Sequence, residues 1–144
     1  MINEVHGNMF KSNCQTLTAP VNMVGTMGNG LALYFKLRFP KVLPIYTKAC
    51  RLRTFLENQL VVVPVDQGRQ VLLFPTKNHW RDDSTIELIE RYLKVLARDY
   101  RLLNIHSLAI PKLGCGKGNL DYDLVSKSLN TILKDMDIPV TVYI

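Results

Sequence analysis

The sequence has little of what marks a metalloprotein, a disulfide-bonded protein or a membrane protein. Its 144 residues contain three cysteines, Cys14, Cys50 and Cys115, with no CxxC pair and no Cys/His spacing typical of a metal site. We therefore expect no metal and no disulfide, and interpret the cysteines as small apolar side chains in a reducing compartment. The longest apolar runs, such as LVVVPV, are too short to span a bilayer, and MINEVHGN does not resemble a secretory signal. These absences predict a cytoplasmic protein without membrane contact.

Acidic residues are also scarce relative to basic ones. There are 12 Asp and Glu residues against 18 Lys and Arg residues, which gives a net charge of +6. A basic surface raises the local concentration of phosphate-bearing partners, so a nucleotide or nucleic acid is favoured. Mild basicity also serves solubility alone, and net charge does not decide between these two interpretations. With 47% hydrophobic residues the chain can bury a core, and its length predicts one domain over residues 1–144, which we expect to be a monomer.

Short segments rich in β-branched residues alternate with amphipathic ones. Strands are predicted at residues 2–6, 14–21, 60–65, 70–74, 106–110 and 140–143. The link VDQGR between the third and fourth segments predicts a hairpin, and hence a mixed sheet. Strands alternating with helices predict an α/β fold with helices on both faces of the sheet. In such folds ligands bind where strands run out into loops, and residues 22–30, 75–81 and 111–119 are loops of this kind.

Three helices are clear from the pattern of apolar residues. The clearest covers residues 84–100, with Ser84 as its N-cap and Glu87 as the capping-box partner. A second helix follows Asp121, and its expected apolar stripe consists of Leu124, Val125, Leu129, Ile132 and Leu133. The third covers residues 28–39, because the proline at position 40 disfavours helical geometry in the residue before it.

The stretch NMVGTMGNGLALYF places three glycines and an asparagine directly before a helix. Glycine lets a backbone approach a ligand closely, and the unpaired N–H groups at the start of a helix suit an anion. Gly25, Gly28 and Gly30 are therefore candidates for shaping an anion pocket, with Asn22 as a hydrogen-bond donor and acceptor. The alternative is an ordinary turn in which Asn22 only ends a strand.

A second glycine-rich loop, PKLGCGKGNLDY, lies between an apolar strand and a helix. The N–H groups around Gly114, Gly116 and Gly118 could converge on phosphate, and Lys112 and Lys117 add positive charge. Neither loop ends in the GK[ST] of a P-loop or contains the GxGxxG of a dinucleotide fold. Two such loops together predict a ligand with two phosphates held between them.

The third segment, FPTKNHWRDDS, concentrates polar and aromatic residues just after a strand. A lysine desolvated in a pocket can act as a base, or as a nucleophile toward an opened sugar aldehyde, so Lys77 is a catalytic candidate. Trp80 can stack on a nucleic-acid base and Arg81 can bind phosphate, with His79 beside them. The alternative is a solvated loop in which Trp80 covers the edge of the core and His79 is structural.

At these three segments the sequence resembles the macrodomain family, and more closely the branch of the DarG antitoxin macrodomains and the terminal ADP-ribose protein glycohydrolase. The matching pieces are HGNMF, APVNMVGTMGNGLALYFKLRFP, FPTKNHWR and IPKLGCGKGNLDY, which follow the family's order across most of the chain. FPTKNHWR together with LGCGKGNLD is specific to the DarG-like branch. The resemblance implies a three-layer α/β/α fold with a central mixed sheet of about six strands. It also implies an ADP-ribose cleft that needs no cofactor.

The resemblance assigns each part of ADP-ribose to residues that match the family's motifs. The residues expected near adenine are Asn8, Met9 and Tyr143. Those expected around the distal ribose are Asn22, Gly28, Asn29, Gly30 and Leu31. Those expected around the diphosphate are Gly114, Cys115, Gly116, Lys117, Gly118 and Asn119. Asn8 stands where the family usually has Asp, and its amide can still meet the adenine amine with less electrostatic attraction.

Lys77 matches the lysine that the resembling enzymes use for catalysis, with Asn22 beside the same ribose. Such a lysine can assist ring opening, or activate the leaving group, and capture the aldehyde. The protein-directed glycohydrolase has an aspartate inside its GCG loop where this chain has Gly118, and DarG-like proteins also lack that acid. The difference favours the DNA-directed branch and leaves the second proton-transfer group open, since Asp121 is better interpreted as a helix cap.

We therefore predict an ADP-ribosyl glycohydrolase that removes ADP-ribose from a modified DNA base, with thymidine as the expected base, and so reverses a DarT-like transferase. The alternatives are a non-catalytic ADP-ribose reader, or a hydrolase of ADP-ribosylated protein or of small derivatives such as the 1″-phosphate and the O-acetyl ester. DarG-type antitoxins often carry a further domain that grips the toxin, whereas this chain ends at Ile144. We expect a stand-alone domain or a piece of a longer protein. A DarT-like toxin stays open as a partner beside ADP-ribose and ADP-ribosylated DNA.

Overall fold

The computed structural model describes residues 2–144 and contains a six-stranded mixed sheet. In chain order the strands are β1 Ile2–Val5, β2 Thr16–Val21, β3 Val61–Pro64, β4 Gln70–Pro75, β5 Leu108–Pro111 and β6 Val140–Tyr143. Their order across the sheet is β1-β6-β5-β2-β4-β3, and all neighbours are parallel except β3, which is antiparallel to β4. The hairpin of β3 and β4 confirms the predicted mixed sheet.

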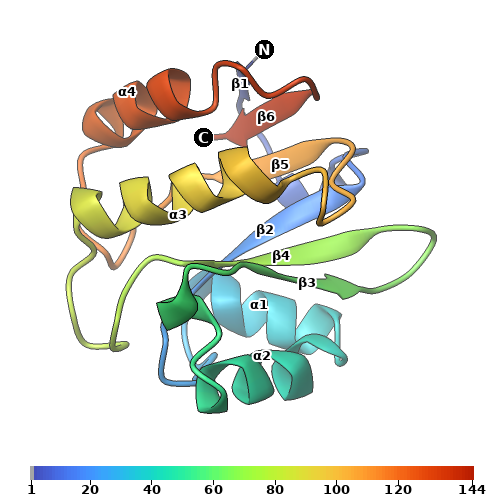
Figure 1. The fold of residues 1–144 in the computed structure, drawn as a ribbon, viewed down its shortest axis with the longest axis vertical. Coiled ribbons are helices and arrows are strands. Elements are labelled where there is room, and N and C mark those ends of the chain that lie inside the picture. Colours follow the sequence, from blue (N-terminus) through green and yellow to red (C-terminus); the bar gives the residue numbers. More distant parts are fainter. Residues whose placement is uncertain (1) are drawn as a thin grey trace.

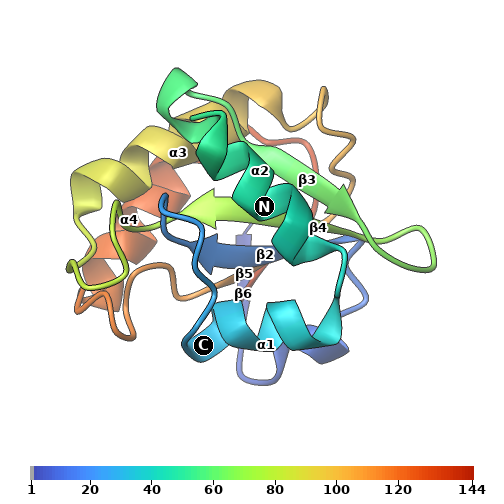
Figure 2. The ribbon, with the colours of Figure 1, turned by 90° about the horizontal axis from the view of Figure 1, so that it is seen from below.

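Helices cover both faces of this sheet. They are α1 Gly30–Arg38, α2 Val42–Arg51, α3 Ile86–Asp99 and α4 Tyr122–Ile132, with short 3-10 turns η1 Met9–Lys11 and η2 Phe55–Glu57. Figure 1 shows α3 and α4 side by side in front of the sheet. Figure 2 shows α1 on the opposite side of the strands from α3, and Figure 1 shows α2 next to α1. The predicted α/β fold with a helical layer on each side is therefore confirmed. Within residues 2–144, none of the helices has the length and apolar character needed to cross a membrane.

The central strands β4 and β5 are buried at every residue. A strand covered on both faces needs an almost continuous apolar run, and VLLFP and LAIP meet this need. Phe74 of β4 packs edge-on against Tyr92 of α3, with 6.3 Å between the ring centroids. Because β2, β4 and β5 are parallel, their carboxyl ends lie at the same edge of the sheet. The loops that follow these strands are the three segments singled out in the sequence.

The start of α3 differs from the prediction. Ser84 was expected to cap the helix, but the N-cap is Thr85, whose side chain accepts a hydrogen bond from the Leu88 N–H at 3.3 Å. Glu87 therefore does not complete a capping box. Ser84 does not cap the helix, because its N–H donates to the Gly118 carbonyl at 2.9 Å and so holds the residue against the second glycine loop.

Two smaller expectations also need correction. Leu124 was placed in the apolar stripe of α4, but its side chain is 45% exposed, and the buried stripe consists of Val125, Leu129 and Leu133. Helix α1 begins at Gly30, two residues later than expected, which leaves Gly28 in the loop. The cap at Asp121 is confirmed, because its side chain accepts from the Asp123 N–H at 2.9 Å.

Candidate active site

A cavity of about 520 Å³ opens at the carboxyl ends of β2, β4 and β5. Its volume lies in the range of small-molecule binding sites. The residues that line it are Pro20, Val21, Asn22, Thr26, Gly28, Asn29, Gly30, Leu31, Ala32, Thr76, Lys77, Trp80, Ser84, Lys112, Gly114, Gly116, Lys117 and Gly118. The cavity is therefore built from the three predicted loops and the first turn of α1.

Asn22 organises the first loop. Its Oδ1 accepts from the Tyr46 hydroxyl at 2.6 Å and from the Val24 N–H at 3.0 Å. Its Nδ2 donates to the Thr26 carbonyl at 2.9 Å and to the Thr26 hydroxyl at 3.0 Å. Burial raises the pKa of Tyr46 far above its usual value, so this hydroxyl stays a proton donor. The Asn22 amide is thus occupied in shaping the loop, and a direct role on the ligand stays a prediction.

The loop after β4 carries Lys77 into the cavity. Backbone hydrogen bonds from Met23 N–H to the Asn78 carbonyl, 3.1 Å, and from Thr76 N–H to the Val21 carbonyl, 2.8 Å, join this loop to the first one. The Lys77 ammonium donates to the Lys117 carbonyl at 3.3 Å and to the Trp80 carbonyl at 3.4 Å. Two backbone oxygens therefore position the amine, and it has no carboxylate partner among residues 2–144.

The second glycine loop lies closely against Ser84. A Cβ added at Gly114, whose φ is +72°, would come within 2.8 Å of the Leu120 side chain and 3.0 Å of the Ser84 Cβ. A Cβ added at Gly118 would overlap the Ser84 hydroxyl and the Gly114 carbonyl. Only glycine fits at these two positions without rearrangement. The side chain of an acid at position 118 is excluded by the same overlap.

The charge inside the cavity is positive. Its charged side chains are Lys77, Lys112 and Lys117, and among residues 2–144 no acidic side chain lines it. Lys117 also donates to Asn29 Oδ1 at 3.2 Å, which links the two glycine loops across the cavity. The start of α1 has no acidic residue in its first turn, so its positive end adds to this field. The arrangement suits an anionic ligand.

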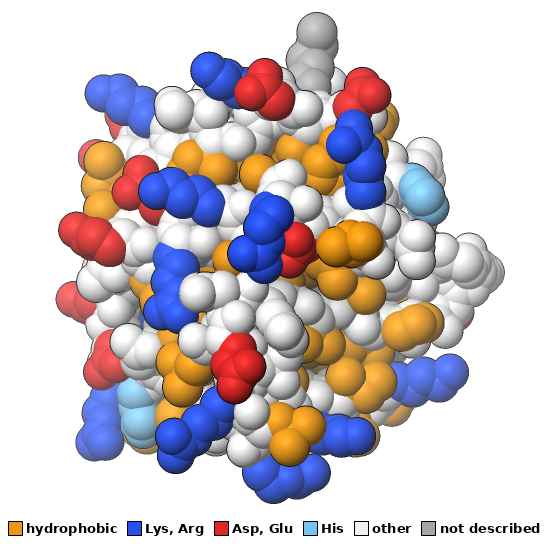
Figure 3. All heavy atoms as spheres, viewed as in Figure 1, with side chains coloured by type: hydrophobic (Ala, Val, Ile, Leu, Met, Phe, Trp, Pro, Cys, Tyr) orange, Lys and Arg blue, Asp and Glu red, His pale blue; other side chains and the backbone are white. Residues whose placement is uncertain are grey.

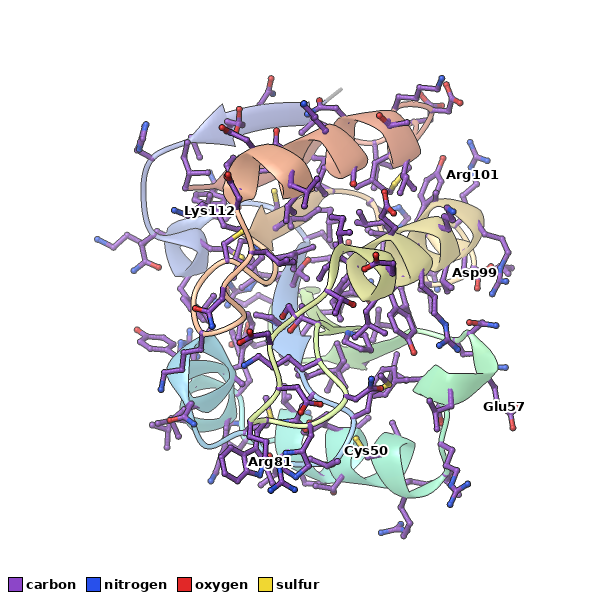
Figure 4. All side chains as sticks on the ribbon, turned by 90° about the vertical axis from the view of Figure 1, so that its left-hand side faces the viewer. Cys50, Glu57, Arg81, Asp99, Arg101 and Lys112 are labelled. Atoms are coloured by element: carbon purple, nitrogen blue, oxygen red, sulfur yellow. The ribbon has the colours of Figure 1, made fainter. Side chains whose placement is uncertain are left out.

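The surface of the helices differs from the cavity in its charge. On the face formed by α3 and α4, basic and acidic side chains are intermixed (Figure 3). Figure 4 looks onto the edge that carries the cavity loops, and it places Lys112 and Arg81 at opposite ends of that edge. Basic residues thus mark both ends of the site.

Twelve of the predicted site residues line the cavity. They are Asn22, Gly28, Asn29, Gly30, Leu31, Lys77, Trp80, Lys112, Gly114, Gly116, Lys117 and Gly118. The others lie outside the lining, namely Asn8, Met9, Gly25, His79, Arg81, Cys115, Asn119 and Tyr143. Residues 2–144 also contain no cluster of three or more His, Cys, Asp or Glu that could hold a metal ion.

The residues expected near adenine lie around β1 and β6. Asn8 caps η1, because its Oδ1 accepts from the Phe10 N–H at 2.9 Å. Met9 is buried in the core, and Tyr143 is half-buried at the end of β6. Their role toward adenine stays a prediction.

Two of the residues that were expected around the diphosphate form hydrogen bonds to other parts of the protein. The Cys115 thiol donates to the Leu113 carbonyl at 3.3 Å, and burial raises its pKa, so it is a protonated thiol rather than a nucleophile at neutral pH. Asn119 donates from Nδ2 to Asp83 at 2.7 Å. These contacts hold the shape of the loop from outside the cavity.

The residues proposed for nucleic acid form a compact aromatic and basic group at the cavity mouth. Trp80 is 53% exposed, and its ring centroid lies 5.1 Å from that of His79. The His79 Nδ1 accepts from the Arg81 N–H at 3.3 Å, and the Arg81 side chain is exposed. An exposed aromatic platform beside Lys77 is therefore available to a ligand.

Three polar residues of the site were not identified from the sequence, namely Thr26, Thr76 and Ser84. Tyr46, which holds Asn22, was also missed. Ser84 carried a misleading signal, because serine before an apolar run is typical of an N-cap. Tyr46 lies on α2, and no local pattern relates it to a residue 24 positions earlier.

Comparison with known proteins agrees with this geometry. Residues 18–129 match the Macro domain family. A DNA ADP-ribosyl glycohydrolase of Mycobacterium tuberculosis is 36% identical, over 99% of this chain and 42% of the relative. The macrodomain of Thermus aquaticus DarG superposes with a TM-score of 0.92 at 36% identity, over 100% of this chain and 98% of that one. The structure of Thermosipho africanus DarTG in complex with ADP-ribose superposes with a TM-score of 0.89 at 36% identity, over 99% of this chain and 41% of that one.

The similarity covers nearly all of this chain but only part of the curated proteins. The chain spans about two fifths of the length of the curated DNA ADP-ribosyl glycohydrolases it matches. Within that span the family match includes all three cavity loops, and the whole chain superposes on the Thermus aquaticus macrodomain. The chain belongs to the Macro domain family.

Proposed function

We propose that this protein is an ADP-ribosyl glycohydrolase that removes ADP-ribose from a modified DNA base, with thymidine as the expected base, and so reverses a DarT-like transferase. The observation that carries the proposal is Lys77, whose amine lies in the cavity between the two glycine loops. The relatives named DNA ADP-ribosyl glycohydrolase and the DarTG complex with ADP-ribose support the same substrate.

The proposed orientation of the ligand follows from the chemistry of the lining. The diphosphate lies against residues 114–118, where backbone N–H groups and Lys117 offer donors. The distal ribose then lies between the first loop and Lys77, and adenine extends toward Asn8, Met9 and Tyr143. This direction places the anomeric carbon of the distal ribose at the end of the cavity next to Trp80.

Hydrolysis breaks the bond between the anomeric carbon and the base nitrogen, and forms a bond from that carbon to the oxygen of water. The water gives up one proton, and the base leaves with one proton on its nitrogen. Lys77 assists this exchange either by proton transfer at the leaving group or by capture of the ring-opened aldehyde. Its contacts to two carbonyl oxygens hold the amine at the ribose.

Recognition of the DNA is assigned to His79, Trp80 and Arg81. The exposed indole of Trp80 can stack on the modified base or its neighbour, and Arg81 can pair with a flanking phosphate. A DarT-like toxin is a proposed partner of the whole protein. The support for it is a relative from Thermosipho africanus that is named as a fusion of a DNA ADP-ribosyl transferase and a DNA ADP-ribosyl glycohydrolase. We also propose that residues 1–144 form one domain that acts as a monomer.

The test is hydrolysis of ADP-ribosylated single-stranded DNA by the native protein and by Lys77→Ala. We expect the substitution to lower turnover at least about 100-fold, the usual scale of proton-transfer catalysis, with little change in ADP-ribose affinity. Lys94→Ala, at an exposed position on α3 outside the cavity, is the matched control and should stay active. Full activity of Lys77→Ala would remove this lysine from the mechanism, and an inactive native protein would refute the activity.

The second candidate is an ADP-ribose-binding module without catalysis. The observation that favours it is the engagement of the Asn22 amide within the protein, together with the absence of an acidic side chain from the cavity lining within residues 2–144. Tight binding of ADP-ribose by calorimetry, with no turnover of modified DNA, modified protein, the 1″-phosphate or the O-acetyl ester, would select it. Turnover of only the small esters or modified protein would select the corresponding hydrolase.

A further inference from the structure

The hydroxyl of Ser84 has no hydrogen-bond partner among residues 2–144, although the residue is only 4% exposed. A buried hydroxyl without a partner lowers the stability of the folded protein, because it has lost its bonds to water. Such groups are rare in folded proteins, and each one calls for an explanation. Ser84 also lines the cavity, so this residue belongs to the candidate site.

The position of this hydroxyl is set by the second glycine loop. The Ser84 N–H donates to the Gly118 carbonyl at 2.9 Å, which fixes the residue under the loop. A Cβ at Gly114 would lie 3.3 Å from the Ser84 Oγ, and one at Gly118 would overlap it. Glycine at both positions therefore leaves room for the Ser84 side chain against the loop.

The charged side chains of the surroundings are hydrogen-bond donors. Lys77, Lys112 and Lys117 line the same cavity, and no carboxylate does so within the described chain. A hydroxyl in such a place can donate to an acceptor, and the acceptor that the cavity favours by charge is an anionic ligand oxygen. Thr18 has the other unpaired buried hydroxyl of residues 2–144, but it lies in β2 and does not line the cavity.

We propose that Ser84 is a ligand-binding residue whose hydroxyl donates a hydrogen bond to a diphosphate oxygen of the bound nucleotide. The inference deepens the proposed function and rests on it, since ADP-ribose supplies the diphosphate. A ligand-binding role of the Ser84 hydroxyl differs from a structural role in its effect on the stability of the free protein. A hydroxyl that bonded to the glycine loop would stabilise the free protein. An unpaired hydroxyl instead destabilises the free protein until a ligand binds to it.

The test compares Ser84→Ala with the native protein by calorimetric titration of ADP-ribose and by thermal unfolding without ligand. We expect affinity to fall about tenfold, the scale of a hydrogen bond to a charged group. We expect the melting temperature to stay the same or to rise, because the unpaired hydroxyl is gone. Titration with ADP, which keeps the diphosphate and lacks the distal ribose, should show a similar loss.

Thr18→Val is the matched control, because it removes an equally unpaired hydroxyl away from the cavity and keeps the shape of the side chain. It should leave the affinity for ADP-ribose unchanged. Native affinity in Ser84→Ala, a lowered melting temperature in that variant, or a loss seen with ADP-ribose but not with ADP would each overturn the assignment. Failure of the native protein to bind ADP-ribose would instead overturn the proposed function, and this inference with it.

Discussion

At the scale of single residues, the site depends on side chains whose partners are far away in sequence. Lys77 reaches a carbonyl 40 residues later, and Lys117 reaches Asn29 across 88 residues. The chemical type of these residues indicated a nucleotide site, but their contacts required the folded chain. The contact between Tyr46 and Asn22 also required the folded chain. Tyr46 lies outside the cavity lining, and its hydroxyl holds the Asn22 side chain in place.

The Tyr46 hydroxyl donates to both the carbonyl and the side-chain oxygen of Asn22, at 2.8 and 2.6 Å. We predict that Tyr46→Phe lowers the free energy of unfolding by about 1–3 kcal/mol, because buried oxygens lose their donor. We also predict several-fold weaker binding of ADP-ribose, because the first loop loses its shape. Urea unfolding and calorimetric titration measure the two effects.

Tyr100→Phe is the control for this prediction. Tyr100 is also buried, and its hydroxyl accepts a single hydrogen bond from the Asp137 N–H at 3.1 Å, outside the cavity lining. Its substitution should lower stability and leave the affinity for ADP-ribose unchanged. Equal affinities in both variants would show that Tyr46 supports only the fold.

At the scale of elements, the site is the meeting place of three loops held by buried parallel strands. The strands β2, β4 and β5 set where each loop begins, and backbone hydrogen bonds then join the loops to one another. The glycines of the second loop are not equivalent in this arrangement. Gly118 is closely packed against Ser84, whereas a Cβ at Gly116 would meet no atom within 4 Å.

This difference predicts opposite outcomes for two alanine substitutions. Gly118→Ala should lower the free energy of unfolding by about 1–3 kcal/mol, because the added methyl group overlaps the Ser84 hydroxyl and the Gly114 carbonyl. Gly116→Ala should change it by no more than about 0.5 kcal/mol. Urea unfolding of both variants measures the contrast, and equal stabilities would contradict the close packing of the loop on Ser84.

At the scale of the whole molecule, the net charge of +6 has a local counterpart at the cavity. The α3–α4 face carries both signs of charge, while the cavity is lined by lysines and has Arg81 at one end of its edge (Figures 3 and 4). A DNA substrate at this edge would be attracted by these basic side chains, and added salt would weaken that attraction.

We predict that Arg81→Ala raises the KM for ADP-ribosylated single-stranded DNA several-fold and reduces its dependence on salt, because one phosphate contact is lost. Affinity for free ADP-ribose should not change, since Arg81 does not line the cavity. Arg101→Ala, an exposed arginine just beyond the end of α3 and away from Arg81 in Figure 4, is the control. Identical salt dependence in the native protein and Arg81→Ala would place the DNA elsewhere.

Local sequence patterns determined the elements and the loops that carry the chemistry. Periodic apolar residues and β-branched runs predicted the strands and the main helices, because burial on one or two faces leaves a local signature. Glycines before a helix, and a lysine after a buried strand, indicated the anion site for equally local reasons. The resemblance to macrodomains added the proposal that the ligand is ADP-ribose.

Only the tertiary structure decided which side chains meet. Ser84 was expected at a helix cap, but its N–H bonds to the Gly118 carbonyl 34 residues later, and its side chain packs against the glycine loop while Thr85 caps the helix. Leu124 fits the apolar stripe by spacing, yet it faces solvent because α4 packs through Val125, Leu129 and Leu133. Contacts of this kind depend on how buried strands bring distant loops together, and no local pattern of residues records that approach.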